Sequence, residues 1–231
     1  MSAFVSAIIV AAGGSTRMGT TDSKQFISLL GKPAISYTLR AFQACDLISE
    51  IVAVCRAEDI GRITAIAKES GVTKLAAVTE GGDCRARSVE NGIRAVSAQA
   101  KYFAIHDGAR PLITPAEITA VVEAAIETGA ATTGTPVTDT IKFADGDNVI
   151  TGTPDRSTLR AVQTPQVFEK ELFTIALSDA EDLASVTDDC SLIEQMGGEV
   201  LIVEGSRENI KLTTPIDAVL AESILRGREE V

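Results

Sequence analysis

Histidine and cysteine, two of the side chains that most often bind zinc, are scarce in this chain. There is a single histidine, His106, and the four cysteines, Cys45, Cys55, Cys84 and Cys190, show no C-x-x-C spacing. We therefore expect no zinc site. Scattered cysteines of this kind are typical of free thiols in a reducing compartment.

Aromatic and positively charged residues are also few. The sequence has no tryptophan and only 4% aromatic residues, so an apolar core must be built mainly from alanine, valine, isoleucine and leucine. Acidic residues outnumber basic ones by 32 to 21, which gives a formal net charge of −11. A non-specific nucleic-acid-binding protein needs a broad basic face. We therefore expect no nucleic-acid partner.

Signals for a membrane are missing from the N-terminal region. The first apolar stretch has no basic region before it, and it is too short to cross a bilayer. A content of 45% hydrophobic and 23% charged residues is that of a globular protein. We expect a cytoplasmic protein with no membrane partner. The 231 residues fit one large domain, residues 1–231, with no internal repeat and no fused second module.

The strongest local signal begins at Ser6. The run SAIIVAA (residues 6–12) predicts a strand buried on both faces. A glycine-rich loop that starts at Gly13 and contains Arg17 follows it, and Lys24 comes seven residues after that arginine. Glycines let backbone N–H groups approach a ligand, and the two cations add positive charge. The pattern favours a polyphosphate-binding loop, with an ordinary flexible turn as the alternative.

Two common phosphate-binding loops do not match this stretch. A Walker loop needs Lys after its second glycine, but Thr20 follows Gly19. The dinucleotide fingerprint G-x-G-x-x-G has a glycine where Ser15 stands, if counting starts at Gly13. The loop is therefore of another kind.

Strands and helices alternate through the first half of the chain. The expected strands after the first are 50–55, 74–79 and 102–106, and the expected helices are 33–44, 58–70, 85–98 and 115–128. Such alternation predicts an α/β fold, a Rossmann-like and mostly parallel sheet with helices on both faces.

The pattern changes after Gly129. Strand-like residues 131–143, the turn sequence DGDN (145–148) and the returning residues 149–153 predict a β-hairpin that protrudes as an arm of roughly residues 136–160. Because an exposed strand edge invites pairing, we expect a second copy of the chain to cover the arm in a homodimer. The remaining expected elements are helices 170–177, 188–196 and 215–226, a strand 199–203 and a short edge strand 209–212.

Three polar turns follow predicted strands, and the carboxyl ends of parallel strands meet in one crevice. The first turn, residues 13–24, offers N–H groups and cations for phosphates. The second contains Asp83 and Ser88, which suit the edge of a base. In the third, Asp107 could bind a divalent cation or ribose hydroxyls, and Arg110 could bind a second phosphate.

Structural roles remain open for several of these residues. They are a turn or capping role for Asp107, an N-cap role for Asp83, a buried structural role for His106, solvent-exposed charges for Arg156 and Lys211, and helix capping for Asp188 and Asp189. As a set, however, the turns describe nucleotidyl transfer. An acceptor phosphate attacks the α-phosphorus of a nucleoside triphosphate, and cations and a metal stabilise the charge without a general base.

A series of motifs spread over nearly the whole chain resembles the 2-C-methyl-D-erythritol 4-phosphate cytidylyltransferase family, which has a nucleotide-diphospho-sugar transferase type of fold. The matching segments are AAG (11–13) through RMG (17–19), KQF (24–26), GGD (81–83) with Arg85 and RSV (87–89), HDGARP (106–111), PVTDTIK (136–142), Asp155-Arg156, QTPQ (163–166), TDD (187–189) and NIKLT (209–213).

The resemblance implies a homodimeric enzyme of the non-mevalonate isoprenoid pathway that transfers CMP from CTP to 2-C-methyl-D-erythritol 4-phosphate, a polyol phosphate, with Mg²⁺ as cofactor. It assigns transition-state and positioning roles to Arg17, Lys24, Arg156 and Lys211, with Arg156 reaching from the arm into the partner's site. It assigns the CTP site to Ala11, Ala12, Gly13, Gly82, Asp83, Arg85, Ser88 and Asp107, with Asp107 beside the metal. It assigns acceptor binding to Arg110, Thr140, Thr164 and Thr187, and it also makes Lys211 a contact to the acceptor phosphate.

Three positions depart from the family's usual pattern. Ser15 replaces the second glycine of the loop, Ser23 stands where proline is typical, and Gly108 stands where alanine is commoner. None of these changes removes a charged group. The alternatives are ribitol-5-phosphate cytidylyltransferase, a sugar-1-phosphate nucleotidylyltransferase and a non-catalytic nucleotide-binding regulator.

Overall fold

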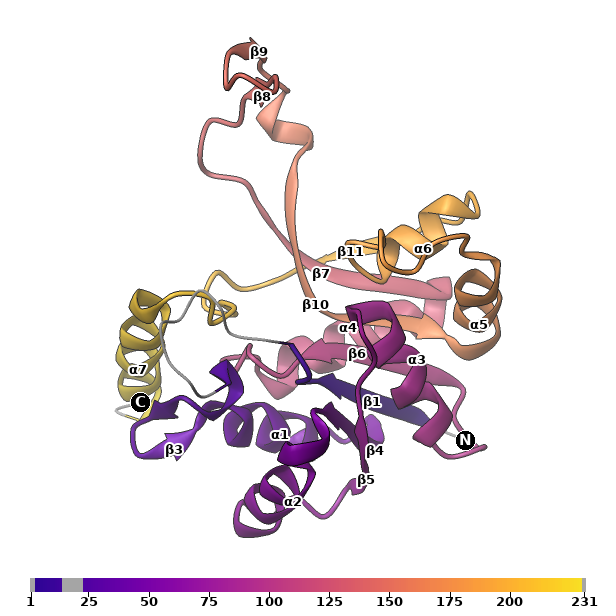
Figure 1. Ribbon diagram of the computed structural model, residues 1–231, viewed down its shortest axis with the longest axis vertical. Coiled ribbons are helices and arrows are strands. Elements are labelled where there is room, and N and C mark those ends of the chain that lie inside the picture. The colour runs from indigo at the N-terminus through magenta and orange to yellow at the C-terminus, as the bar shows by residue number, and fades with distance from the viewer. Residues whose placement is uncertain (1–2, 14–22, 230–231) are drawn as a thin grey trace.

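The computed structural model describes residues 3–13 and 23–229. Its central feature is a seven-stranded sheet in the order β11-β7-β10-β6-β1-β4-β5 (Figure 1). The strands are β1 (Val5–Val10), β4 (Ile48–Cys55), β5 (Leu75–Glu80), β6 (Tyr102–Asp107), β7 (Ala130–Pro136), β10 (Arg160–Glu169) and β11 (Leu201–Glu204). Only β10 runs antiparallel to its neighbours among these strands. The expected mostly parallel α/β sheet is confirmed.

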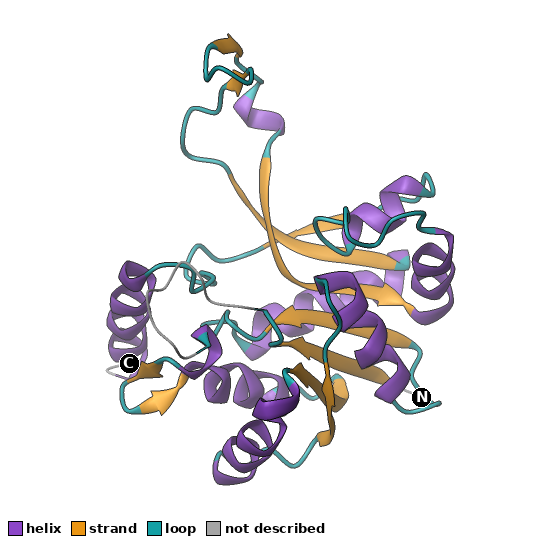
Figure 2. Ribbon diagram, viewed as in Figure 1, coloured by secondary structure: helices purple, strands orange, loops and turns teal. Residues whose placement is uncertain are grey.

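Helices cover both faces of the sheet (Figure 2). Side chains alternate along β1, so Ile9 faces a core with α1 (Ala34–Ala44), α2 (Ile60–Glu69) and α4 (Pro115–Thr128). Its neighbour Ile8 faces the opposite core. That second core contains residues of α3 (Arg85–Ala95), α5 (Lys170–Asp179) and α6 (Cys190–Gln195).

Helix α4 shows how local signals set element ends. Thr114 caps its N-terminus, and its side chain and that of Glu117 bond each other's backbone N–H in a capping box. The helix ends at Gly129, whose φ of +86° lies in the left-handed region that glycine adopts without strain. The expected helix 115–128 is confirmed to the residue.

A smaller apolar cluster lies beside the main sheet. It joins the last helix, α7 (Pro215–Glu229), to the two-stranded β2 (Ser28–Leu29) and β3 (Lys32–Pro33), through buried residues that include Leu29 and Leu225. Among the described residues, no helix combines the length and the apolar character that a membrane span needs.

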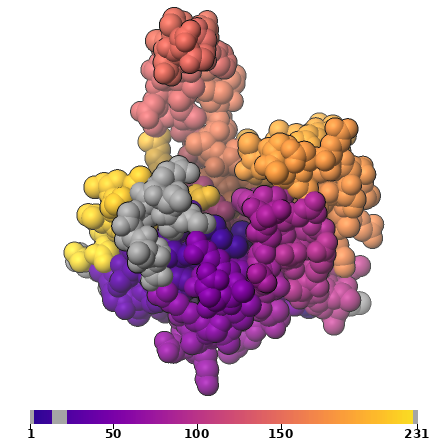
Figure 3. All heavy atoms as spheres, viewed as in Figure 1, coloured from indigo at the N-terminus to yellow at the C-terminus, as the bar shows by residue number. Residues whose placement is uncertain are grey.

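The arm (residues 136–160) projects from the body, as Figures 1 and 3 show. At its far end, β8 (Phe143–Ala144) pairs antiparallel with β9 (Ile150–Gly152). The turn between them is held by Asp145, whose carboxylate accepts hydrogen bonds from the backbone N–H groups of Asp147 and Val149. Three 3₁₀ turns complete the elements: Lys24–Phe26, Ala57–Asp59 and Arg156–Thr158.

Two strand expectations were wrong, and one strand was missed. The strand expected over 131–143 ends at Pro136. Residues 209–212 form no strand, because their backbone bonds the loop at 109–110 instead of a neighbouring strand. Strand β10 was missed because Pro165 cannot donate a ladder hydrogen bond, and the register with β7 shifts between Val162 and Gln166 to accommodate it.

Candidate active site

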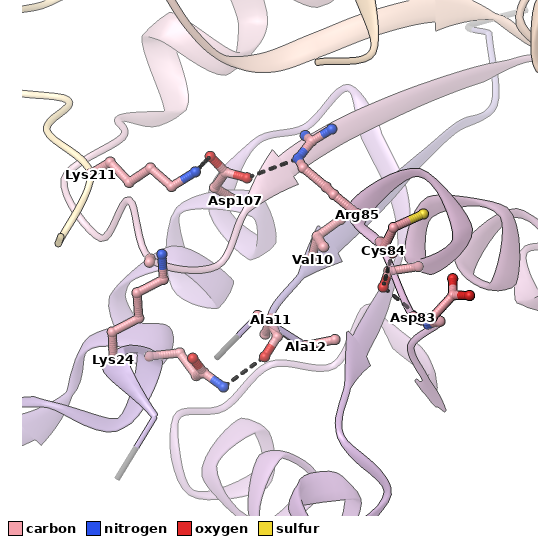
Figure 4. Close-up of a pocket in the computed structure, with 14 residues that line it drawn as sticks. Val10, Ala11, Ala12, Lys24, Asp83, Cys84, Arg85, Asp107 and Lys211 are labelled. Carbon is pink, nitrogen blue, oxygen red and sulfur yellow. Dashed lines mark hydrogen bonds and ion pairs between the residues drawn. The ribbon is translucent and has the colours of Figure 1, made fainter. Parts of the chain in front are cut away.

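The described residues of the three turns predicted to meet surround one cavity at the carboxyl ends of the strands. Its volume is about 260 Å³. The lining residues are Val10, Ala11, Ala12, Gly13, Lys24, Gln25, Gly82, Asp83, Cys84, Arg85, Ser88, Asp107, Ala109 and Lys211. Figure 4 shows Lys24 and Lys211 on one side of the cavity and Asp83 on the other. Arg17 and Ser15 lie outside the described residues.

The end of β1 is held by a buried amide. Gln25 is 1% exposed, and its Nε2 donates to the Ala11 carbonyl oxygen over 2.6 Å. The Ala11 N–H in turn donates to Val54 over 2.7 Å, so this backbone is fixed from both sides. The same 3₁₀ turn carries Lys24 to the cavity. The sequence presents Gln25 only as part of the KQF motif, because its burial and its bond to Ala11 depend on the packing of the fold.

The second polar turn, which begins at Gly81, packs its backbone closely against the end of β1. The Gly82 N–H donates to Ser88 Oγ over 3.1 Å, and Ser88 Oγ donates to the Cys84 carbonyl oxygen over 3.0 Å. A Cβ on Gly81 would overlap the methyl of Ala12, so only glycine fits beside the end of β1. The N-cap of α3 is Cys84, whose Sγ accepts from Arg87 N–H, so the N-cap role considered for Asp83 is wrong. Asp83 is exposed at the cavity wall.

Asp107 ends β6 and is the centre of a charge cluster. Its carboxylate lies 2.8 Å from Lys211 Nζ, 3.4 Å from Arg85 Nε and 3.7 Å from Arg110 Nε. Burial acts to raise the pKa of Asp107, but the charges of Arg85, Lys211 and Arg110 outweigh it and hold that pKa well below its usual range. The carboxylate is therefore ionised at neutral pH, and it faces the cavity.

Behind Asp107 lies the only histidine of the chain. His106 is fully buried, with Nδ1 3.0 Å from Thr164 Oγ1 and Nε2 3.2 Å from the Arg110 carbonyl oxygen. Burial lowers the pKa of His106 to about 3, so it is neutral at physiological pH. The placement fits the structural role. Thr164 also accepts from the Asp107 N–H, which puts its hydroxyl behind Asp107.

Lys211 reaches Asp107 because its segment is anchored on both sides. Buried Asn209 donates through Nδ2 to the Thr164 carbonyl oxygen over 2.9 Å, and Arg110 Nη1 donates to the Asn209 carbonyl oxygen over 2.7 Å. The Leu212 N–H donates to the Ala109 carbonyl oxygen over 2.9 Å. Lys211 is thus an ion-paired cavity residue, and the surface-charge interpretation of it is wrong. Asn209 was missed as an anchor, because a buried amide cannot be recognised without knowing its neighbours.

Arg85 was expected to support the cytidine site, and the structure places it between two carboxylates. Its Nε is 3.4 Å from Asp107 and its Nη1 is 2.8 Å from Asp189. Burial alone would lower the pKa of Arg85, but the two carboxylates raise it above its ordinary value. Asp189 makes no side-chain cap at α6, so the capping role considered for it is wrong.

Five of the described residues predicted for the site do not line this cavity. Two of them lie directly behind its wall: Arg110 contacts Asp107, and buried Thr164 accepts a hydrogen bond from the Asp107 N–H. Thr140 and Arg156 are exposed on the arm, where Arg156 Nη1 donates to the Thr138 carbonyl oxygen over 2.6 Å. Thr187 is exposed in the turn before α6. The described residues of one chain therefore bring together the nucleotide-side set, Lys211 and Arg110, and leave the arm residues apart.

Known proteins resemble this chain in both sequence and fold. The profile of the family described as 2-C-methyl-D-erythritol 4-phosphate cytidylyltransferase matches residues 5–227. The enzyme of that name from Rubrobacter xylanophilus is 48% identical over 96% of this chain and 95% of its own length. That from Caldanaerobacter subterraneus subsp. tengcongensis is 46% identical over 96% of this chain and 99% of its own.

Solved structures agree with these relatives. The crystal structure of 4-diphosphocytidyl-2C-methyl-D-erythritol synthase from Anaerococcus prevotii has a TM-score of 0.86 and 29% identity, covering 98% of this chain and all of that one (100%). That of 2-C-methyl-D-erythritol 4-phosphate cytidylyltransferase from Thermus thermophilus has a TM-score of 0.76 and 32% identity, covering 96% of this chain and 99% of that one. With sequence and fold matching over nearly its whole length, this chain belongs to the 2-C-methyl-D-erythritol 4-phosphate cytidylyltransferase family.

Proposed function

We propose that this chain transfers CMP from CTP to 2-C-methyl-D-erythritol 4-phosphate. The products are 4-diphosphocytidyl-2-C-methyl-D-erythritol and pyrophosphate, in the non-mevalonate isoprenoid pathway. The observation that carries the proposal is full-length membership in the cytidylyltransferase family. The cavity supports it, because glycine backbone and several cations converge there on one ionised carboxylate.

The nucleotide half of the site is assigned to the two glycine turns. Exposed Gly82 and Asp83 and the Ser88 hydroxyl that fixes them are placed to read the cytosine edge. The backbone of Ala11 to Gly13 and the ammonium of Lys24 are placed for the ribose and phosphates. Arg17 is proposed to bind the triphosphate with Lys24, as the family pattern implies.

The reaction places negative charge on the α-phosphoryl group and on the departing pyrophosphate. Lys24 and Lys211 enter the cavity from one side and can stabilise this charge while holding two polyanions together. An acceptor phosphate is already anionic, so the site needs no general base. This agrees with a neutral, fully buried His106.

Mg²⁺ is the proposed cofactor, and Asp107 is the residue proposed to hold it. The ionised Asp107 carboxylate lines the cavity, and it fits an ion that is usually bound by one or two carboxylates together with substrate phosphates. When bound, the ion would neutralise charge on the triphosphate. Lys211, now paired with Asp107, is placed to meet the acceptor phosphate.

A homodimer through the arm is the second part of the proposal. The arm exposes apolar residues, with Phe143 58% and Ile150 62% exposed, and it carries Arg156 away from the cavity of its own chain. A second copy would cover the apolar residues and receive Arg156 and Thr140 in its own site. We also propose a cytoplasmic location, which suits four described cysteines that are all free.

Pyrophosphate release in the presence of CTP and Mg²⁺ tests the function, with methylerythritol phosphate and ribitol 5-phosphate compared as acceptors. We expect turnover with the first alone. Turnover with ribitol 5-phosphate alone would keep the CTP site and overturn the acceptor. No turnover with either would contradict an enzyme and favour a nucleotide-binding regulator.

A further inference from the structure

Asp189 is a buried carboxylate on the far side of Arg85 from the cavity. Its side chain is fully buried, with Oδ2 2.8 Å from Arg85 Nη1. Within the described residues, Oδ1 has no hydrogen-bond partner. An ionised, incompletely bonded carboxylate is expensive to bury, so its presence needs a reason.

The Asp189 carboxylate is not needed to hold helix α6. The neighbouring Asp188 caps α6, since its Oδ1 accepts from the Ser191 N–H over 3.2 Å. Gln166 on β10 ties the same turn to the sheet: its Oε1 accepts from the Asp189 N–H and its Nε2 donates to Asp188 Oδ2, each over 2.9 Å. Only the backbone of Asp189 takes part in these bonds, so its carboxylate does not hold the turn.

Stability is not the reason either. Burial raises the pKa of Asp189 above the ordinary value, and Arg85 only partly opposes that effect. Folding therefore disfavours the ionised form of Asp189 relative to water. Costly charges of this kind are kept at functional sites.

The contacts of Arg85 indicate what the Asp189 carboxylate does. The guanidinium is planar and can meet two carboxylates along different edges, and it does so here with Asp107 through Nε and Asp189 through Nη1. Asp107 lies at the cavity, as Figure 4 shows for its contact with Arg85. Asp189 binds the Arg85 guanidinium through one edge and so holds it in one position. From that position the guanidinium orients the Asp107 carboxylate through its other edge.

We infer that Asp189 is a positioning residue for nucleotidyl transfer: it fixes Arg85, and Arg85 in turn fixes the Asp107 carboxylate at the nucleotide side of the cavity. The inference rests on the proposed function. With the charge of Asp189 removed, Arg85 keeps one anionic partner and moves toward Asp107, which then turns its oxygens away from the cavity. Small displacements of a reacting group lower turnover steeply.

The test compares Asp189→Asn with Asp188→Asn, a matched control one residue away. This control keeps one oxygen to accept from Ser191, loses the second acceptor that now serves Gln166, and contacts no residue of the cavity. For Asp189→Asn we expect kcat/KM for CTP to fall about tenfold or more, as is usual for residues that orient a ligand-binding group. We expect an unchanged KM for the acceptor and a melting temperature within about 2 °C of the parent protein. Asp188→Asn should lower the melting temperature, because one of the hydrogen bonds from Gln166 and Ser191 is lost, and should keep kcat/KM within about threefold.

A double variant tests whether the effect passes through Arg85. Asp189→Asn combined with Arg85→Gln should lose no more activity than Arg85→Gln alone, since residues that act as a unit are not additive. If the activity losses of Asp189→Asn and Arg85→Gln multiply in the double variant, the inference is overturned. Equal activity losses in Asp189→Asn and Asp188→Asn would also overturn it, as would an activity loss that merely follows the melting temperature.

Two further measurements keep the inference testable. Arg85→Lys, which cannot span both carboxylates, should show the same loss even if Asp189→Asn fails to fold, and full activity in Arg85→Lys would overturn the inference. Calorimetry with CTP and Mg²⁺ but no acceptor should show affinity about fivefold weaker or more in Asp189→Asn. This binding measurement stands even if the parent protein turns over neither acceptor, which separates a failure of the inference from a failure of the proposed function.

Discussion

The cavity wall and the arm use charged residues in opposite ways. At the cavity, Asp107 is 7% exposed and meets three cations within 4 Å, so each side chain is held by another. On the arm, Arg156 is exposed, and its guanidinium donates a hydrogen bond to the Thr138 carbonyl oxygen of the same arm. The described residues of the cavity wall come together within one chain, whereas the arm is the part that we propose acts on a second copy of the chain.

Burial explains why the difference matters for function. In a low-dielectric setting, charges interact strongly and hold a fixed geometry, which favours chemistry on a polyanion. An exposed arginine is screened by solvent and salt until a partner covers it. We therefore expect mutations at the cavity to damage each subunit by itself, and mutations on the arm to damage the site of the neighbouring subunit.

The largest effect is expected for Lys24→Ala. Because this ammonium faces the space proposed for the triphosphate, its loss should lower turnover by about a hundredfold or more. Steady-state pyrophosphate release measures the effect. Lys32→Ala, an exposed lysine in β3, is the control and should be near the parent rate. A parent-like rate for Lys24→Ala would remove the proposed catalytic role.

Arg156→Ala tests most directly whether the arm acts on the site of a second subunit. It should lower turnover by about tenfold or more and leave the melting temperature unchanged, because the side chain is exposed. Mixing Lys24→Ala with Arg156→Ala subunits should restore about a quarter of the parent activity, since statistical pairing of a twofold dimer gives that share of intact sites. No recovery on mixing would show that Arg156 serves its own chain or that subunits do not exchange, and chains refolded together distinguish these two cases.

A pair of glycines tests how tightly each region is packed. Gly81→Ala should destabilise the protein by about 1–3 kcal/mol and weaken CTP binding, because the new Cβ would overlap Ala12 and approach Ser88 Oγ at 2.8 Å. Gly146→Ala at the tip of the arm should change stability by less than about 0.5 kcal/mol, since nothing lies within 4 Å of its Cβ position. Urea denaturation of both variants measures the difference. Equal effects would contradict the contrast in packing.

The smallest expected effect is the pH response of His106. Its pKa falls from an ordinary value of 6.5 to about 3 on folding, so the unfolded chain binds more protons between those values. Stability should therefore decrease as pH falls through that window, by at most about 1.4 kcal/mol per pH unit from this group. NMR of the sole imidazole should show no titration down to pH 4 in the folded protein and titration near 6.5 in urea. Titration near 6.5 in the folded state would show that the ring is not buried as described.

The sequence was sufficient for features that depend on neighbours along the chain. Helix α4 was predicted to the residue, because Thr114, Glu117 and Gly129 are signals that act within a few positions. The buried strand β1 and the meeting of three turns followed from hydrophobic patterning and from the geometry of parallel sheets. Motif spacing was enough to identify the family.

Only the tertiary structure decided which polar groups are buried and what they touch. The sequence did not distinguish Asp188, which caps a helix, from Asp189, which contacts Arg85 from a position 104 residues away in the chain. Nor did it show that Asn209 anchors Lys211, or that residues 209–212 bond a loop instead of a strand. Such contacts join segments far apart in sequence, and a residue's burial and partners depend on that packing rather than on its own chemical type.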